Sequence, residues 1–210
     1  MKKQKVLVIL GPTASGKSDL AIRLAQKFNG EIISADSRQV YRGLNIGTGK
    51  ITKKEMRGVP HYMLDVVNPK KYFSVSDYKK LAEEYISYIV YNKKLPIIVG
   101  GTGFYIDTLI GKINLPEVPP NKWLRRKLNK LSKEKLFTML LKKDPRRAKE
   151  IYSRNKVRII RALEILETLG QVPKVIKSKA EYEYIFIGIR PNKRDLEKRI
   201  YKRILKRFDG

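Results

Sequence analysis

A glycine-rich stretch near the start of the chain has the residue types and spacing that bind phosphate. Residues 11–18 read GPTASGKS and match the pattern G-x-x-x-x-G-K-[ST]. The apolar run VLVIL (6–10) precedes them, and residues 18–28 have helical apolar spacing, so the stretch should join a strand to a helix. Backbone N–H groups and the helix N-terminus would then surround phosphate oxygens. The expected phosphate-binding residues are Gly11, Pro12, Thr13, Ala14, Ser15, Gly16, Lys17 and Ser18.

Two side chains of this loop have separate expected tasks. Lys17 would neutralise the terminal phosphate, and the Ser18 hydroxyl is a candidate ligand of Mg²⁺, the cofactor that we expect. A loop of this kind binds phosphorylated ligands in general, and ATP or GTP is its default ligand. The motif alone therefore leaves a P-loop small-molecule kinase open.

An acidic residue follows the second predicted strand. Asp36 lies directly after EIISA (31–35), and α/β sheets place their active sites at the carboxyl ends of strands. Its carboxylate could act as a general base, as an outer ligand of Mg²⁺ or as a cap of the next turn. The position favours a catalytic role.

The elements that must position these residues alternate between strand and helix. We predict strands at 6–10, 31–35 and 96–100 and helices at 18–28 and 77–91, which implies an α/β fold: a P-loop NTPase-like parallel sheet flanked by helices. From residue 115 the sequence is charged and helical in spacing, with helices predicted at 123–131, 133–142 and 157–169. A strand (182–189) and a helix (192–208) then return to the sheet.

This pattern predicts a P-loop core of residues 1–114, an inserted helical and basic subdomain of residues 115–180, and a return to the core at 181–210. The chain has 210 residues with 47 Lys+Arg against 20 Asp+Glu, a formal net charge of +27. Of the 47 basic residues, 28 follow residue 120. Such an excess is typical of proteins that bind a polyanion, so we expect a nucleic acid to contact the second half.

Composition excludes several classes of protein and of site. There is no cysteine and only one histidine, so disulfides, thiolate metal sites and histidine clusters are impossible. No window approaches the roughly 20 apolar residues of a membrane span, so we expect a soluble, cytoplasmic protein without a membrane or obligate protein partner. His61 lies at the start of a predicted buried strand, and we expect it to be structural or to support residues that contact the ligand.

Several motifs together resemble the tRNA dimethylallyltransferase (isopentenylpyrophosphate transferase) family, and the resemblance covers essentially the whole chain. They are GPTASGKS (11–18), DSRQVYRGLNIGTGK (36–50), PHYMLDVVNP (60–69), FSVSDY (73–78), VGGTGFYIDTL (99–109), VRIIRALEI (157–165) and IGIRPNKRDLEKRIYKR (187–203). The resemblance implies transfer of a dimethylallyl group from dimethylallyl diphosphate to N6 of the adenosine 3′ of the anticodon in tRNA, with Mg²⁺.

The resemblance also assigns roles to single residues. Asp36 would accept the proton of the adenine amine, while Thr13 would lie near the reacting centre and Arg203 would contact the diphosphate. Arg199, one turn before Arg203, is expected to belong to a solvated charged face, and residues 100–103 to form a tight turn. The expected tRNA contacts, with the anticodon stem-loop as partner, are Asp36, Ser37, Arg38, Gln39, Thr102, Arg125, Arg158 and Arg161.

The sequence departs from the family pattern in two ways. Gly49 and Ile51 replace the usual alanine and proline, which should change only the stiffness of the loop. Family members also continue into a further helical segment, so we expect a chain truncated at the C-terminus that binds the diphosphate but turns over tRNA poorly. A relative that prenylates free nucleotides and a tRNA-binding fragment with impaired catalysis remain open.

Overall fold

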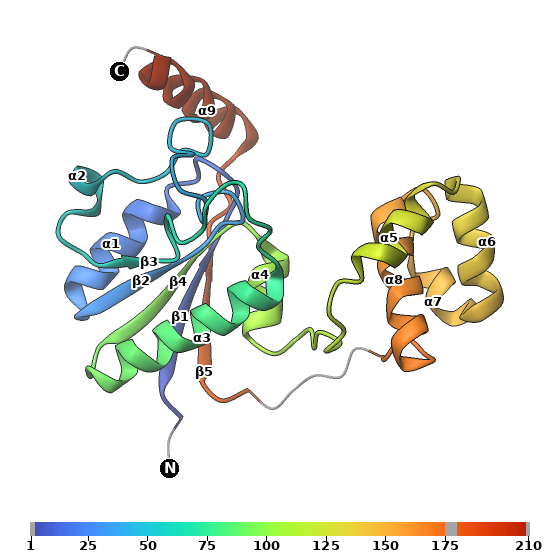
Figure 1. Ribbon diagram of the computed structural model, residues 1–210. Coiled ribbons are helices and arrows are strands. Elements are labelled where there is room, and N and C mark those ends of the chain that lie inside the picture. Colours follow the sequence, from blue (N-terminus) through green and yellow to red (C-terminus); the bar gives the residue numbers. More distant parts are fainter. Residues whose placement is uncertain (1–2, 175–179, 209–210) are drawn as a thin grey trace. The chain divides into compact units, whose positions relative to one another are not determined.

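The computed structural model describes residues 3–174 and 180–208 (Figure 1). Contacts divide the chain into two compact units. The α/β unit comprises the residues up to Ile113 and those from Lys177 onward, and the helical unit comprises Asn114–Ile176.

The α/β unit is built on a five-stranded parallel sheet with the order β3-β2-β4-β1-β5. The strands are β1 (Lys5–Leu10), β2 (Gly30–Ala35), β3 (His61–Tyr62), β4 (Leu95–Gly100) and β5 (Glu183–Gly188). Leu10 pairs with both Gly100 and Gly188, and Gly100 pairs with Ala35. Four strands therefore end level with one another, so the loops that follow them meet at one edge of the sheet.

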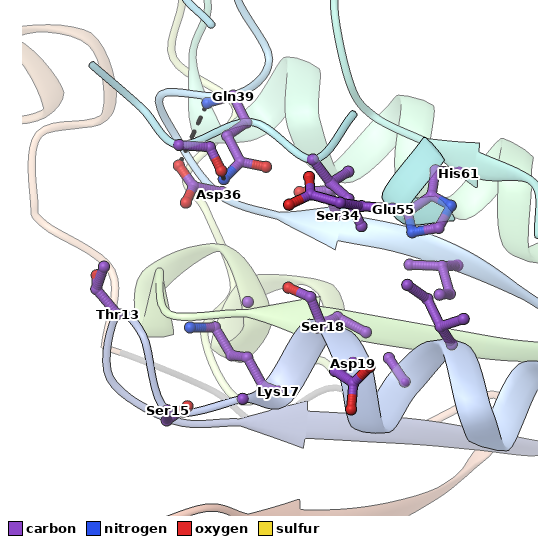
Figure 2. A pocket seen from close by; sticks show the side chains of 18 of the residues that line it. Thr13, Ser15, Lys17, Ser18, Asp19, Ser34, Asp36, Gln39, Glu55 and His61 are labelled. Carbon is purple, nitrogen blue, oxygen red and sulfur yellow. Dashed lines mark hydrogen bonds between the residues drawn. The ribbon is translucent and has the colours of Figure 1, made fainter. Parts of the chain in front are cut away.

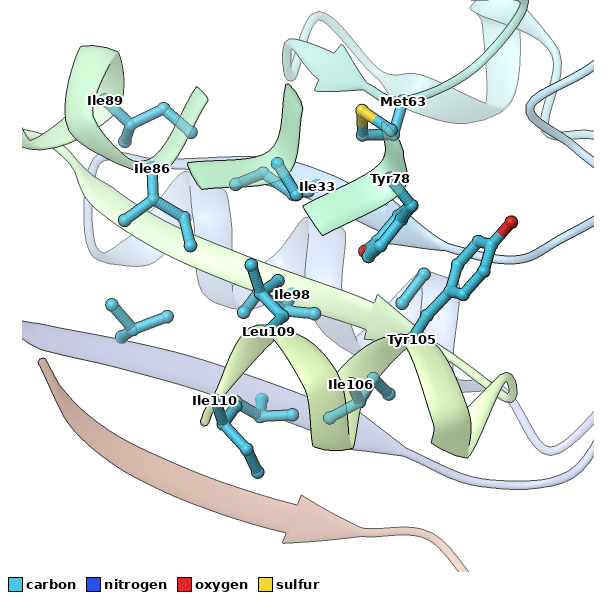
Figure 3. Packing of buried hydrophobic residues seen from close by; sticks show 14 residues of the cluster. Ile33, Met63, Tyr78, Ile86, Ile89, Ile98, Tyr105, Ile106, Leu109 and Ile110 are labelled. Atoms are coloured by element: carbon cyan, nitrogen blue, oxygen red, sulfur yellow. The ribbon is translucent and has the colours of Figure 1, made fainter. Parts of the chain in front are cut away.

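Alternate residues of each strand pack on opposite faces of the sheet. Ile9, Ile32 and Ile97 pack with α1 (Lys17–Lys27) on one face. The other face carries the larger core, which packs against α3 (Val75–Tyr91) and α4 (Gly103–Leu109) (Figure 3). There the rings of Tyr78 and Tyr105 stack with centroids 4.0 Å apart, and the Tyr78 hydroxyl donates to the Ser34 carbonyl oxygen over 3.2 Å.

The helical unit contains α5 (Lys122–Asn129), α6 (Lys133–Lys143), α7 (Pro145–Glu150) and α8 (Lys156–Leu169). Side-chain caps start all four helices, from Asn121, Ser132, Asp144 and Asn155. Gly170, with φ of 73°, ends α8 in the left-handed conformation that glycine adopts without strain. Leu136, Leu140 and Ile159 are fully buried and form the centre of the core.

The α/β class and the parallel sheet predicted from the sequence are confirmed. Three short elements were not predicted from the sequence: α2 (Lys53–Met56), α4 and α7. Each spans only four to seven residues, too few to show a period. The strand expected to start at His61 is present as β3, although its two residues are only half-buried. The expected turn at 100–103 in fact leads directly into α4. Within the described residues no helix is both long and apolar enough to cross a membrane.

Candidate functional site

A pocket of about 450 Å³ opens where the sheet ends, with the phosphate-binding loop on one side and the end of β2 on the other (Figure 2). Thr13 to Asp19 line it from the loop and α1, and Asp36 and Gln39 line it from the segment after β2. Ile22, Ile32, Ile51 and Val99 add apolar wall. The pocket thus combines a polar floor suited to an anion with room for a small apolar group.

The phosphate-binding loop is tightly wound. Ala14 and Gly16 have φ of 62° and 92°, which turns the backbone before the first helical residue. A Cβ on Gly11 would lie 2.7 Å from the Ser15 Oγ and 2.9 Å from the Ile189 carbonyl oxygen, so this position requires glycine. The buried Ser15 hydroxyl has no hydrogen-bond partner among the described residues. A buried hydroxyl of this kind can bond to a ligand that enters the loop.

Lys17 and Asp36 face one another across the pocket (Figure 2). The Lys17 Nζ donates to the Pro12 carbonyl oxygen over 2.8 Å, which folds the side chain over the loop. Burial lowers the pKa of Lys17 from its ordinary value, the Asp36 carboxylate opposes that shift, and the Arg203 guanidinium adds to it. An entering anion would restore favourable surroundings to this ammonium.

The Asp36 carboxylate caps the turn that follows β2. Its Oδ1 accepts hydrogen bonds from the backbone N–H of Arg38 over 2.9 Å and of Gln39 over 3.3 Å. Both bonds end on the same oxygen. The cap and the catalytic role considered for Asp36 are therefore compatible, because one oxygen orients the carboxylate while the other can take a proton.

Thr102 holds the neighbouring residue of the same segment. Its Oγ1 accepts from the Ser37 backbone N–H over 3.1 Å, and its own N–H donates to the Ala35 carbonyl oxygen over 3.2 Å. The strands are close here, because a Cβ on Gly100 would lie 2.1 Å from that same Ala35 oxygen. The glycines before Thr102 thus let β4 position the segment that carries Asp36.

The last described helix, α9 (Lys193–Phe208), contributes two arginines to the pocket wall. Arg199 Nη1 donates to the Ser15 carbonyl oxygen over 3.4 Å, and Arg203 Nη2 donates to the Gly49 carbonyl oxygen over 3.1 Å. Arg199 is exposed, as expected of a solvated charged face, but its contact with the phosphate-binding loop was not expected. The i, i+4 spacing predicted that Arg199 and Arg203 share one face of the helix. It did not show that this face lies beside the phosphate-binding loop.

The arginines predicted on the inserted helices have different surroundings within the helical unit. Arg125 donates to both carboxylate oxygens of Glu164, over 2.8 and 2.7 Å, and Arg161 also bonds to Glu164. Glu164 is fully buried. Burial would raise its pKa, but the hydrogen bonds from both arginines outweigh this and lower it. Arg158 is exposed on the same helix as Arg161.

Other pocket residues were not singled out as site residues from the sequence. Glu55 and His61 line the end away from Asp36, and His61 Nδ1 lies 2.8 Å from the Val59 carbonyl oxygen. Thr48 and Gly49 line the side near Gln39, whose Nε2 donates to both of their carbonyl oxygens over 3.3 and 3.4 Å. From the sequence, glycine at position 49 was expected to change only the stiffness of this loop.

Known proteins resemble this chain over nearly its full length. The family model described as IPP transferase matches residues 39–210. A tRNA dimethylallyltransferase of Thermoanaerobacter sp. (strain X514) is 44% identical over 98% of this chain and 67% of the relative. One of Staphylococcus epidermidis is 43% identical over 97% of this chain and 65% of the relative. The chain thus spans about two thirds of the length of these relatives.

Solved structures that resemble this chain point to the same family as the sequence relatives. The full-length tRNA isopentenylpyrophosphate transferase of Bacillus halodurans has 39% identity and a TM-score of 0.68 over 99% of this chain and 67% of that one. A eukaryotic dimethylallyltransferase acting on tRNA has 29% identity and a TM-score of 0.82 over 98% of this chain and 53% of that one. With the phosphate-binding loop, the facing carboxylate and these matches in agreement, the chain belongs to the IPP transferase family, the family of tRNA dimethylallyltransferases.

Proposed function

We propose that this chain transfers the dimethylallyl group of dimethylallyl diphosphate to N6 of the adenosine 3′ of the anticodon in tRNA. The observation that carries the proposal is the placement of Asp36 and Lys17 on opposite sides of one pocket. A base for an incoming amine and a cradle for a departing diphosphate would then flank the allylic carbon that reacts between them.

The reaction would proceed by displacement at the first carbon of the allyl group. The N6 lone pair forms the new C–N bond, the C–O bond breaks, and the diphosphate leaves with its electron pair. N6 loses one of its two protons, and this proton passes to the Asp36 carboxylate. The Arg38 and Gln39 N–H groups already orient that carboxylate through Oδ1. Lys17, Thr13 and the loop N–H groups would stabilise the charge that develops on the leaving oxygen.

The residues present fit a magnesium ion that is held chiefly by its substrate. Ser18 lies in the first turn of α1 and lines the pocket next to Lys17. No group of three or more histidines, cysteines or carboxylates that could hold a metal occurs in the described part of the chain. Mg²⁺ commonly takes one or two protein ligands and fills its remaining positions with phosphate oxygens and water. When bound through Ser18, it would neutralise part of the diphosphate charge.

Recognition of the base and of the tRNA would divide between the two units. Ser37, Gln39 and Thr102 lie beside Asp36 and could bond to the edges of the flipped adenine or of its neighbours. Arg158 is exposed, and the guanidinium groups of Arg125 and Arg161 remain partly exposed beside Glu164. These groups would contact phosphates of the anticodon stem.

The test is direct. The protein is incubated with dimethylallyl diphosphate, Mg²⁺ and unmodified tRNA, and the nucleosides are analysed by mass spectrometry. We expect dimethylallyl on the adenosine 3′ of the anticodon and not on a tRNA with guanosine there. Turnover of ATP with a small-molecule acceptor, in the absence of prenyl transfer, would instead favour a kinase.

A further inference from the structure

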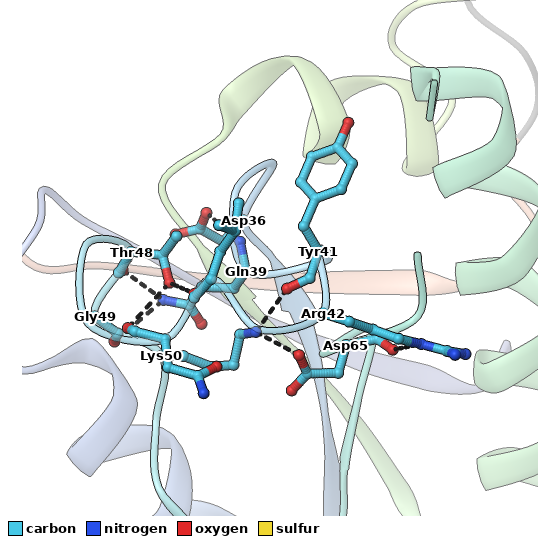
Figure 4. A network of polar contacts seen from close by, with 10 residues as sticks. Asp36, Gln39, Tyr41, Arg42, Thr48, Gly49, Lys50 and Asp65 are labelled. Carbon is cyan, nitrogen blue, oxygen red and sulfur yellow. Dashed lines mark hydrogen bonds and ion pairs between the residues drawn. The ribbon is translucent and has the colours of Figure 1, made fainter. Parts of the chain in front are cut away.

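Lys50 is a buried cation next to the pocket that no catalytic step uses. Its side chain is 5% exposed, and its Nζ donates to the Tyr41 carbonyl oxygen over 2.7 Å and to the Asp65 Oδ1 over 2.5 Å (Figure 4). The ammonium thus joins three segments: the turn after β2, the GTGK loop, and the stretch after β3. Burying a charge costs free energy unless the charge is paired and hydrogen-bonded. The Lys50 ammonium meets both conditions.

Asp65 is the other end of this junction, and its backbone is strained. Its φ is 55°, in the left-handed region that residues with a Cβ rarely adopt. Three bonds fix it there: its N–H donates to the Gln39 carbonyl oxygen over 3.2 Å, its carbonyl oxygen accepts from the Arg42 Nε over 2.8 Å, and its carboxylate binds Lys50. Strained residues of this kind persist where their surroundings hold them and are frequent at functional sites.

Lys50 anchors residues 44–50, and two side chains of the pocket donate hydrogen bonds to a carbonyl oxygen of this segment. Residues 44–50 fold back on themselves, with Lys50 N–H donating to the Asn45 carbonyl oxygen over 3.1 Å. The Gly49 carbonyl oxygen accepts from Gln39 Nε2 and from Arg203 Nη2. Placement of Gln39 and Arg203 therefore depends on where residues 44–50 lie; Figure 4 shows Gln39 against this segment.

We propose that Lys50 and Asp65 are positioning residues, which fix residues 44–50 so that the Gly49 carbonyl oxygen holds Gln39 and Arg203 at the reacting centre. This inference rests on the proposed function for its effect on the rate. The structural part, an ordered segment that depends on one ion pair, is independent of it.

The experiment compares Lys50→Met, Asp65→Asn and the double variant with wild type, and Lys53→Met is the matched control. Lys53 is an exposed lysine three residues further along the chain. Met keeps the length of the side chain, and Asn tolerates the left-handed backbone. Amide hydrogen exchange is followed by mass spectrometry without ligand. Prenyl transfer is measured per folded site, with the folded fraction taken from the stoichiometry of pyrophosphate binding in calorimetry.

We expect residues 44–50 to exchange at least about tenfold faster in both single variants, with α1 and the sheet strands unchanged. kcat should fall about tenfold to a hundredfold, since a small misplacement of reacting groups is costly in rate. KM for the allylic diphosphate should rise by less than kcat falls, because Arg203 is displaced and not removed. The double variant should be no worse than the poorer single variant, because each removes the same contact. Lys53→Met should match wild type.

Three outcomes would overturn the inference. Unchanged exchange at 44–50 would show that the ion pair does not order the segment. Faster exchange throughout the α/β unit would make the pair a general stabiliser of the fold. Normal kcat per folded site in Lys50→Met would show that Gln39 and Arg203 do not need the segment. Wild-type protein without prenyl transfer would refute the proposed function, while the exchange rates would still decide whether Lys50 and Asp65 order residues 44–50.

Discussion

Arg203 on α9 donates from Nη2 to the carbonyl oxygen of Gly49, 154 residues earlier in the chain, over 3.1 Å. This bond holds one more cation at the wall of the pocket that contains Lys17. The guanidinium can reach an anion in the pocket while it remains tied to the loop, since it has five N–H donors.

Replacing Arg203 by alanine should therefore weaken pyrophosphate binding about tenfold to a hundredfold, the loss expected for one charge-assisted hydrogen bond. Calorimetric titration with pyrophosphate and Mg²⁺ measures it. Lys202→Ala removes an exposed charge from the same helix and is the control. Equal affinities for Arg203→Ala and wild type would remove Arg203 from the diphosphate site.

Asp36→Asn separates the two tasks of that carboxylate. The amide oxygen can still accept from the Arg38 and Gln39 N–H groups, so the turn should stay folded. The proton acceptor is lost, and prenyl transfer should fall about 10²- to 10⁴-fold. Single-turnover transfer to tRNA measures the rate, and filter binding should give a tRNA affinity within a few-fold of wild type. Near-normal chemistry would show that another group takes the proton.

Glu164→Gln should destabilise the helical unit. Glu164 is completely buried and binds two arginines, so its neutral replacement leaves two cations without their partner. We expect a loss of about 3 kcal/mol in the free energy of unfolding, as for other broken buried ion pairs. Urea titration measures it. Glu167→Gln, on an exposed residue of the same helix, should change stability by less than about 0.5 kcal/mol. Similar small losses in both variants would contradict the structural role.

His61 should make the stability of the folded protein fall as the pH falls. Burial lowers the pKa of His61 below its ordinary 6.5, against a contact with the Val59 carbonyl oxygen that raises it. As pH falls through 6.5, the unfolded chain takes up a proton more readily than the folded one, so stability is present above that pH and is lost below it. Urea unfolding from about pH 7.5 to about pH 5 should show a steeper loss in wild type than in His61→Gln. Parallel curves would rule out this contribution.

Local patterns predicted most of the α/β unit and residues on two facing sides of the pocket. Residues 11–18 and Asp36 could be found from the sequence because a motif and the end of a strand are properties of neighbouring residues. The contacts of Arg199 and Gly49 could not, since they depend on which segments the fold brings together from opposite ends of the chain.

The ion pair between Glu164 and Arg161 could have been predicted from the sequence. It lies within the apolar stretch of α8, three residues after Arg161, where an unpaired carboxylate would be costly. A buried acid of this kind requires basic partners. Arg161 could have been assigned to it from spacing alone, whereas Arg125, 39 residues away, could not.

The position of β5 at the edge of the sheet affects how the chain folds during synthesis. β5 pairs with β1, yet the whole helical unit is synthesised between them. At about 5 to 20 residues per second, the free edge of β1 waits roughly 10 to 40 s for its partner. Contacts within Asn114–Ile176 are local, so that unit can fold during the wait. An exposed parallel edge is prone to pair with other chains, so nascent chains of this family should depend on chaperones most during the synthesis of the insertion.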